Sequence, residues 1–184
     1  RNYNLDTYTS AFGTELEGFR RGLQALFYFS DHVTFDLSGR RVDLSAPINV
    51  STLSGQTNFT TRRVLTNGQL NALTNTAWNS DVITSIATYD AADPERLTAV
   101  ANVANIPVGA RITATGVGRE IYVTSKNIGA GTVQLSAPLW GAAGTRTFTF
   151  TRYKYMLDFS DFDLLSRFEI TDMEFQCNGF ASGI

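Results

Sequence analysis

Acidic side chains gather near the C-terminal end of the chain, and carboxylates are the groups with which glycoside hydrolases cleave polysaccharides. Two of them flank the scissile bond, about 5 to 9.5 Å apart according to the mechanism. Acids on the outer face of a strand also keep a β-sheet soluble, and this structural role is the more frequent one for such a cluster. We therefore assign no catalytic residue, and the balance favours a segment without enzymatic activity. The four candidates are Asp158, Asp163, Glu169 and Glu174.

Two arginines and two tryptophans are candidates for contacts with a glycan or with another subunit. Arg41 and Arg63 lie 22 positions apart, which is close to one coil of a β-solenoid. If the turns that carry them stack, acidic sugars or a neighbouring subunit's carboxylates would relieve the repulsion between the two guanidinium groups. Trp78 and Trp140 could stack on sugar rings through their aromatic faces. The alternatives are independent, solvated turns for the arginines and a place in the core of a small β module for Trp140.

The composition excludes several classes of protein and site. The chain has 184 residues, a formal charge of -2, one His and one Cys. A nucleic-acid-binding domain usually has a pI above about 9, whereas the sequence pI here is about 5.4. Cys177 alone can form neither an internal disulfide nor a Cys-based zinc site, and His32 is better explained as a surface or capping residue than as a catalytic base. We expect no metal, no cofactor, no nucleic acid and no membrane insertion.

The low content of charged residues points to a particular surface. Charged residues make up 17% of the chain, against about 25% in an average soluble domain. Solvent-facing positions must therefore be filled largely by Thr, Ser, Asn, Gln and Gly. Such a surface is typical of extracellular and virion β proteins.

One amphipathic helix is predicted near the N-terminus. Thr14 followed by Glu17 forms a capping box, and apolar residues then recur at helical spacing up to about Phe29. Beyond this helix, apolar and polar residues alternate with a period of two, in short runs separated by turns such as Asn67-Gly68. This pattern predicts strands without further convincing helices.

The middle of the chain has a different pattern of apolar runs and turns from its two ends. Between about Asp81 and Tyr155, five short runs and glycine-rich turns predict a small antiparallel β-barrel or sandwich. We therefore divide the chain into the helix with the first coils at residues 1–81, an inserted β domain at 82–155, and continuing coils at 156–184. The outer segments share short alternating runs separated by turns, a pattern that suits a solenoid, whose coils stack at about 4.8 Å. The chain begins without Met, and we expect it to be a segment of a longer protein with sequence missing at both ends.

A family resemblance supports this division. The helix followed by residues 33–50, VTFDLSGRRVDLSAPINV, resembles the opening of the right-handed parallel β-helices of the pectate-lyase-like family, and residues 168–180, FEITDMEFQCNGF, are similar to their later coils. Residues 106–116 and 132–138 are similar to a β module of tailed-phage structural and spike proteins. The resemblance implies an all-β chain: the start of a right-handed parallel β-helix, capped by one N-terminal α-helix and carrying the small antiparallel module as an insertion.

The resemblance also implies a function. It points to a structural and receptor-binding spike, on the tail or the head of a tailed bacteriophage or of a phage-like particle such as a gene transfer agent. Such a spike lies on the particle surface, contacts other virion proteins and attaches to host cell-surface polysaccharide. Spikes of this family are usually homotrimers, whereas a capsid vertex would impose pentameric symmetry. The alternative is a depolymerase, a polysaccharide lyase or glycoside hydrolase on the same β-helix.

Overall fold

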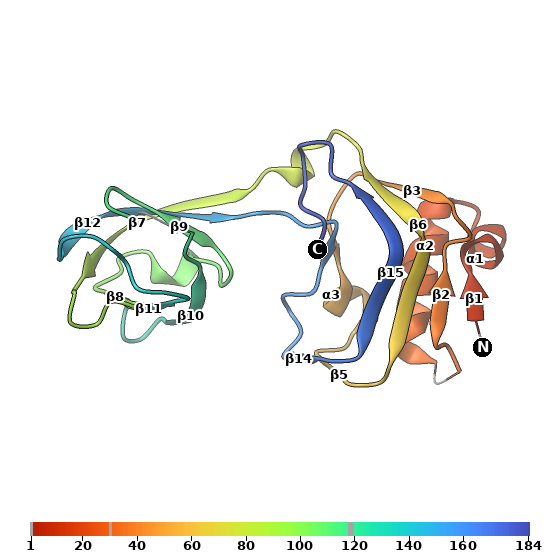
Figure 1. Cartoon of the computed structure of the whole chain (residues 1–184), viewed down its shortest axis with the longest axis horizontal. Helices are drawn as coiled ribbons and strands as arrows, with labels where there is room; N and C mark the ends of the chain where they lie inside the picture. Colours follow the sequence, from red (N-terminus) through yellow and green to blue (C-terminus); the bar gives the residue numbers. More distant parts are fainter. Residues whose placement is uncertain (1, 30, 118–119) are drawn as a thin grey trace. The chain divides into compact units, whose positions relative to one another are not determined.

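The chain folds into two compact units, each with its own cluster of buried apolar side chains. The computed structural model describes residues 2–29, 31–117 and 120–184. The first unit comprises Arg1–Asn79 and Lys154–Ile184, and the second comprises Ser80–Tyr153 (Figure 1). Helices take up 18% of the chain and strands 40%. In the described part of the chain, no helix is long and apolar enough to cross a membrane.

Two helices open the first unit, and each begins at a side-chain cap. In α1 (Leu5–Phe12) the Asn4 side chain accepts a hydrogen bond from the amide of Thr7 at 2.9 Å. In α2 (Glu15–Tyr28) the Thr14 hydroxyl accepts one from the amide of Glu17 at 3.2 Å. Both bonds satisfy backbone donors that have no partner inside a helix. The start of α2 is therefore confirmed, whereas the sequence analysis did not predict α1.

The apolar face of α2 is buried against strands of the first unit. Phe19, Leu23 and Leu26 are fully buried, and the helix contacts β2 (Thr34–Asp36), β3 (Arg41–Leu44) and β6 (Arg63–Ala72). The approach is closest at Gly22, where an added Cβ would lie 2.2 Å from the ring of Phe35. Only glycine lets the ring lie against the helix backbone in this way.

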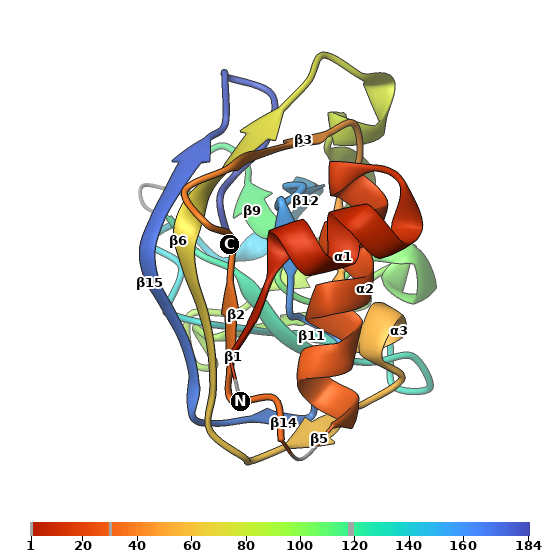
Figure 2. The same cartoon turned by 90° about the vertical axis from the view of Figure 1, so that its right-hand side faces the viewer.

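The strands of the main sheet in the first unit all run parallel. Their order is β1-β2-β6-β15, with β3 also paired to β6 beyond the end of β2 (Figure 2). The side chains of Phe35, Leu65 and Leu70 point into the core from this sheet, and Val42 joins them from β3. The two remaining strands of the sheet are β1 (Asn2–Asn4) and β15 (Phe168–Gln176).

Two shorter parallel ladders complete the first unit. Each pairs a strand that precedes the second unit in the sequence with a strand that follows it. Ile48 pairs with Leu157 in one ladder, and Asn58 pairs with Leu164 in the other. Each strand in these ladders is two residues long. A short α-helix separates the first strands of the two ladders in the sequence, and a 3₁₀ helix follows β6. These elements are β4 (Ile48–Asn49), α3 (Val50–Ser54), β5 (Asn58–Phe59), η1 (Thr76–Trp78), β13 (Leu157–Asp158) and β14 (Leu164–Leu165).

Neighbouring strands of the main sheet bend at left-handed residues that lie side by side. Asn67 in β6 has φ 60°, and Asp172 in β15 has φ 51°. The register pairs the residues that flank them, which places the two bends next to each other. Ser38, with φ 56°, lies in the turn between β2 and β3, where the amide of Gly39 donates to the carbonyl of Asn67 at 2.7 Å. The predicted turn at Asn67-Gly68 is therefore wrong, because β6 continues through it.

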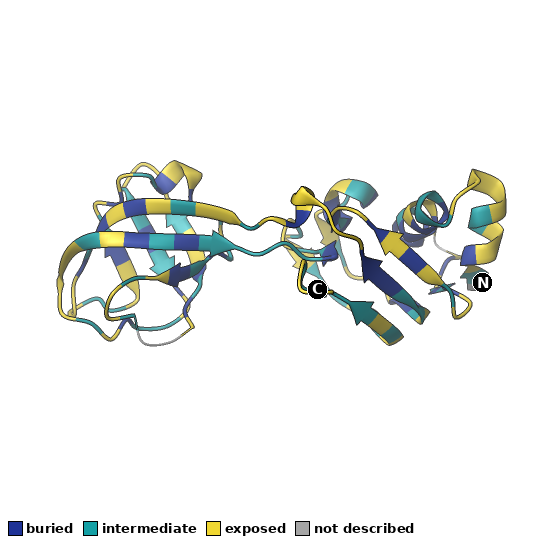
Figure 3. Cartoon of the chain, turned by 90° about the horizontal axis from the view of Figure 1, so that it is seen from above, coloured by how far each residue is buried: buried dark blue, intermediate teal, exposed yellow. Residues whose placement is uncertain are grey.

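The second unit is a six-stranded antiparallel sheet in the order β10-β11-β8-β7-β12-β9. Its ends approach each other, since the amide of Ile112 donates to the carbonyl of Ile121 and that of Val123 to Ala110, both at 2.9 Å. Buried and exposed residues alternate along its long strands (Figure 3). Its elements are β7 (Asp81–Tyr89), β8 (Arg96–Thr98), η2 (Val103–Asn105), β9 (Arg111–Thr113), β10 (Val123–Asn127), β11 (Thr132–Leu135) and β12 (Gly144–Arg152).

These observations overturn the expected fold class, an all-β chain that starts a right-handed parallel β-helix under one N-terminal α-helix. The fold is mixed: three α-helices accompany the strands of the described residues, parallel pairing is confined to the first unit, and the largest sheet is antiparallel. The physical reason is that helices of eight and five residues, such as α1 and α3, are too short for a helical period to stand out beside strands with a period of two. Both helices begin at asparagine side-chain caps, Asn4 and Asn49.

The contact at Gly22 gives a prediction for stability. In an uncrowded helix, alanine in place of glycine would stabilise by up to about 1 kcal/mol. We expect Gly22→Ala to destabilise the protein instead, by about 1 to 3 kcal/mol, because its methyl group displaces the Phe35 ring. Urea denaturation measures this change. In a Phe35→Leu background the cost should shrink; an equal cost in both backgrounds would contradict the contact.

Candidate functional site

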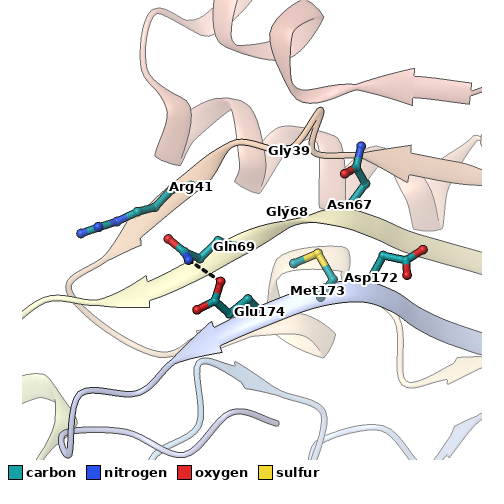
Figure 4. A pocket seen from close by; sticks show the side chains of 8 residues that line it. All are labelled: Gly39, Arg41, Asn67, Gly68, Gln69, Asp172, Met173 and Glu174. Carbon is teal, nitrogen blue, oxygen red and sulfur yellow. Dashed lines mark hydrogen bonds between the residues drawn. The ribbon is translucent and has the colours of Figure 1, made fainter.

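One concave surface of the first unit is a polar groove over β3, β6 and β15 (Figure 4). Its volume is about 550 Å³. We call it the polar groove and define it by its lining residues, which come from three adjacent strands and the turn before β3. They are Gly39, Arg41, Asn67, Gly68, Gln69, Asp172, Met173 and Glu174.

The strand register places the polar side chains of the groove in one row. Gln69 in β6 pairs with Arg41 on one side and with Glu174 on the other. The bends at Asn67 and Asp172 lie next to this row. At Gly68 a Cβ would lie 2.4 Å from that of Leu37, so glycine lets the turn between β2 and β3 approach the floor of the groove.

Hydrogen bonds hold several of these side chains in place. The Gln69 amide donates to Glu174 at 2.6 Å, as Figure 4 shows, and the Gln176 amide donates to the other carboxylate oxygen at 3.0 Å. The bonds from Gln176 and Gln69 hold the pKa of Glu174 below its ordinary value. Arg41 donates from Nε to Asp43 at 2.9 Å. The groove therefore presents amide, guanidinium and carboxylate groups on a hydrogen-bonded sheet.

The four candidate carboxylates are not brought together in this groove. Glu174 lines it, whereas Glu169 forms two hydrogen bonds of 2.8 Å with Arg62, which lower the pKa of its carboxyl. Asp158 accepts from the amide of Ser160 at 2.9 Å, and the backbone of Asp163 donates to Thr57 at 2.8 Å. A general acid must hold its proton near neutral pH, so the lowered pKa values at Glu169 and Glu174 do not suit that role.

The two predicted arginines lie in different environments and do not share an edge. Arg41 is exposed and pairs with Asp43. Arg63 is buried, with an exposed fraction of 4%, and it bonds the last carbonyls of α2. Its Nε donates to Leu26 at 2.6 Å and its Nη2 to Phe29 at 3.3 Å. A cation suits this place because a helix C-terminus carries partial negative charge. Arg63 is thus part of the structure of the first unit and cannot contact a glycan.

The two tryptophans also differ. Trp78 is buried, and its indole N–H donates to the carbonyl of Leu73 at 2.8 Å, so it cannot stack on a sugar. Trp140 is 71% exposed, on the loop between β11 and β12, and does not fill the core of the second unit. Leu139 is the buried residue of that loop. The role of Trp140 as a glycan or subunit contact stays a prediction.

His32 lies in an aromatic cluster. It is buried, its Nε2 is 2.9 Å from the hydroxyl of Tyr8, and its ring stacks on Tyr3 with centroids 3.3 Å apart. Burial lowers the pKa of His32 from its ordinary 6.5, and the positive charge of Arg63 adds to this. Cys177 is half-buried and packs against the apolar core. In the described part of the chain, no three His, Cys, Asp or Glu residues are grouped so that they could hold a metal ion.

The groove contains residues that the sequence analysis did not select. Gln69 looks like an ordinary strand residue in the sequence, and Asn67-Gly68 predicts a turn instead of a site. The only signal in the sequence was asparagine before glycine, because asparagine adopts left-handed backbone more readily than most residues. Nothing in the sequence pairs Gln69 with Glu174, which lies 105 positions away.

Comparisons with known proteins assign no family to the chain. No protein-family model matches it, and no curated protein matches it significantly. The resemblance to phage spike proteins therefore stays a prediction.

The two arginines give a prediction that separates their roles. We expect Arg63→Ala to lower the free energy of unfolding by about 2 to 3 kcal/mol, since buried carbonyls at the end of α2 lose a charged donor. Arg41→Ala is the matched control and should change it by less than about 0.5 kcal/mol, because its ion pair is exposed. Chemical denaturation measures both. Equal effects of the two substitutions would contradict the assigned roles.

His32 gives a prediction for the pH dependence of stability. The unfolded chain binds the proton more readily, because its His32 has the ordinary pKa of 6.5 and the folded one a lower pKa. Stability from this group is therefore complete above pH 6.5 and falls as the pH drops through that value. Melting temperatures between about pH 7 and pH 5 test it, since carboxylates titrate lower. His32→Asn, which removes the only His, should flatten the profile; an unchanged slope would refute the assignment.

Proposed function

We propose that this chain is an attachment component on the surface of a bacteriophage or phage-like particle, and that its polar groove binds host cell-surface polysaccharide. The observation that carries the proposal is the row formed by Arg41, Gln69 and Glu174 on three adjacent strands, with Asp172 beside it. The polar, weakly charged surface of the chain is in keeping with a place outside the cell. The particle itself is inferred from the resemblance described above.

The chemistry of the groove suits sugar hydroxyls. Each hydroxyl both donates and accepts hydrogen bonds, so a site for sugars needs both kinds of group. The bond from Arg41 to Asp43 uses Nε, which leaves the two terminal nitrogens of the guanidinium as donors. The Gln69 carbonyl and the Asp172 carboxylate can accept. A hydrogen bond between a sugar hydroxyl and the Arg41 guanidinium or the Asp172 carboxylate would contribute about 1.5 to 3 kcal/mol.

The charge of the groove indicates which sugars it would take. Arg41 contributes one positive charge, and Asp172 and Glu174 contribute two negative charges, so the lining has a formal charge of -1. A negative lining repels uronic and sialic acids and accepts neutral or amino sugars. Because Arg63 is buried in the first unit, Arg41 and Arg63 cannot bind an acidic glycan together.

Rigidity favours binding in this groove. The bond between Gln69 and Glu174 joins side chains of adjacent strands, and the ladder between β6 and β15 holds their backbones. A site whose side chains are already placed loses less conformational entropy when a ligand binds. A polysaccharide repeats its units, so modest affinity at each copy of the site would add up across a particle.

Cleavage of the polysaccharide is the second candidate function. It is favoured by one observation, that Asp172 and Glu174 both line the groove. Binding without cleavage fits the groove better, because hydrogen bonds from Gln176 and Gln69 favour the ionised form of Glu174, whereas a glycosidase needs one protonated acid.

Titration calorimetry with surface polysaccharides purified from candidate host bacteria tests the proposal. We expect Gln69→Ala and Asp172→Asn each to weaken binding roughly tenfold, because the first removes a neutral hydrogen-bond partner of the sugar and the second removes a charged acceptor. Asparagine at position 172 keeps a residue that tolerates the left-handed backbone.

Arg62→Ala is the matched control. It removes a charge from the connection between β5 and β6, outside the groove, and should leave the affinity unchanged. If the wild-type chain binds no such polysaccharide, or if the groove variants bind as well as the wild type, the proposal fails. A reducing-end assay on the same samples separates the two functions. Sugar release that Asp172→Asn abolishes would identify a depolymerase instead.

A further inference from the structure

The two ends of the polar groove differ in their hydrogen-bonding groups. In Figure 4, Arg41 lies at one end and Asn67 and Asp172 lie at the other, with Gln69 and Glu174 between them. The Arg41 end can only donate, because a guanidinium has no acceptor, whereas the side chains of Asn67 and Asp172 both have acceptor oxygens. A ligand that fits the whole groove therefore needs acceptors at one end and donors at the other.

The acceptors at the Asn67 end are open. Among the residues that the structure describes, none donates to the side-chain oxygen of Asn67, whose Nδ2 donates to Asp36 at 2.9 Å. The exposed Asp172 side chain has neither a hydrogen bond nor an ion pair within the same part of the chain. The Asp36 carboxylate also accepts from the amide of Ser38, at 2.7 Å, and no described cation forms an ion pair with it. Two negative charges outside any described ion pair therefore lie at this end.

The opposite end is close to neutral. Arg41 donates to Asp43 at 2.9 Å, and Asp43 is held in place by a second hydrogen bond, from Asn71 at 2.7 Å. A fixed carboxylate thus offsets the positive charge of the guanidinium. Glu174 adds a negative charge in the middle of the groove. A ligand therefore meets a negative potential that strengthens toward Asp172, and such a potential attracts cations.

We propose that the polar groove selects hexosamines whose nitrogen carries no acetyl group, and that their ammonium group binds beside Asn67 and Asp172. This inference rests on the proposed function and narrows the ligands of that groove to amino sugars. An ammonium group has three donors and no acceptor, which matches the open acceptors at this end. The sugar hydroxyls would then reach Gln69 and the terminal nitrogens of Arg41.

Acetylation of the sugar nitrogen removes this match. An N-acetyl group is neutral, has a single N–H donor and adds a carbonyl oxygen, which is a further acceptor. An acceptor placed against the Asp172 carboxylate loses its hydrogen bond to water and gains none. A neutral hydroxyl would fit but forms the weaker bond, because a hydrogen bond with charge on both groups is about twice as strong as a neutral one.

Titration calorimetry with two oligosaccharides that differ only in acetylation tests the inference on the full chain. The probes are the tetramers of β-1,4-linked glucosamine and of β-1,4-linked N-acetylglucosamine, at about pH 6, where an amine of this kind carries its proton. We expect the amino tetramer to bind about tenfold more tightly or better. Added salt should reduce this difference, because it screens the charges of an exposed groove.

Variants separate the ammonium contact from the hydroxyl contacts. Asp172→Asn keeps an acceptor and removes the charge, so it should weaken binding of the amino tetramer roughly tenfold and that of the acetylated tetramer by less than about threefold. Gln69→Ala should weaken both tetramers alike. Glu95→Gln is the matched control, because it removes one negative charge from an exposed residue of the second unit and should leave both affinities unchanged.

Tetralysine is the control ligand, since its side chains carry the same number of ammonium groups without sugar hydroxyls. It should bind about tenfold more weakly than the amino tetramer or not at all. Equal binding of tetralysine overturns the inference, as do equal binding of the two tetramers and an Asp172→Asn effect that is the same for both. Equal binding of the tetramers leaves polysaccharide binding intact. If neither tetramer binds, this inference fails, and the polysaccharides of the host bacteria decide the proposed function separately.

Discussion

The close contact between helix α2 and the ring of Phe35 is the constraint on which the first unit depends. Gly22 permits it, since any Cβ at that position would overlap the ring. Arg63 secures the other end of the helix by bonding the carbonyls of Leu26 and Phe29. The helix is thereby fixed to β2 at one point and to β6 at another. Because β3 and β15 both pair with β6, the position of the polar groove follows from these two contacts.

The groove owes its form to an uncommon backbone conformation. Asn67 and Asp172 adopt left-handed backbone in adjacent strands, where asparagine and aspartate cost less than other residues with a Cβ. Two strands that bend at the same level can keep their hydrogen bonds on both sides of the bend, as the register shows. The bend then places Gln69 and Glu174 beside a hollow instead of on a flat sheet. A local backbone feature thus shapes the polar groove.

The two units divide the surfaces that we propose to be functional. The polar groove belongs to the first unit, and the exposed Trp140 belongs to the second. Each unit has its own core, so substitutions in one need not disturb the other.

The sequence alone was sufficient to predict those elements that depend on residues close together in the chain. The capping box at Thr14 predicted the start of α2, and alternation predicted β7, β9, β10, β11 and β12, because both signals come from residues a few positions apart. The three residues of β8 were missed, since so short a strand has no period to detect. Only the tertiary structure decided that α1 and α3 accompany the strands of the first unit, that Arg63 and Trp78 are buried while Arg41 and Trp140 are exposed, and that Gln69 meets Glu174. These outcomes depend on contacts between residues far apart in the chain, and an arginine or tryptophan has the same local signature whether or not another segment covers it.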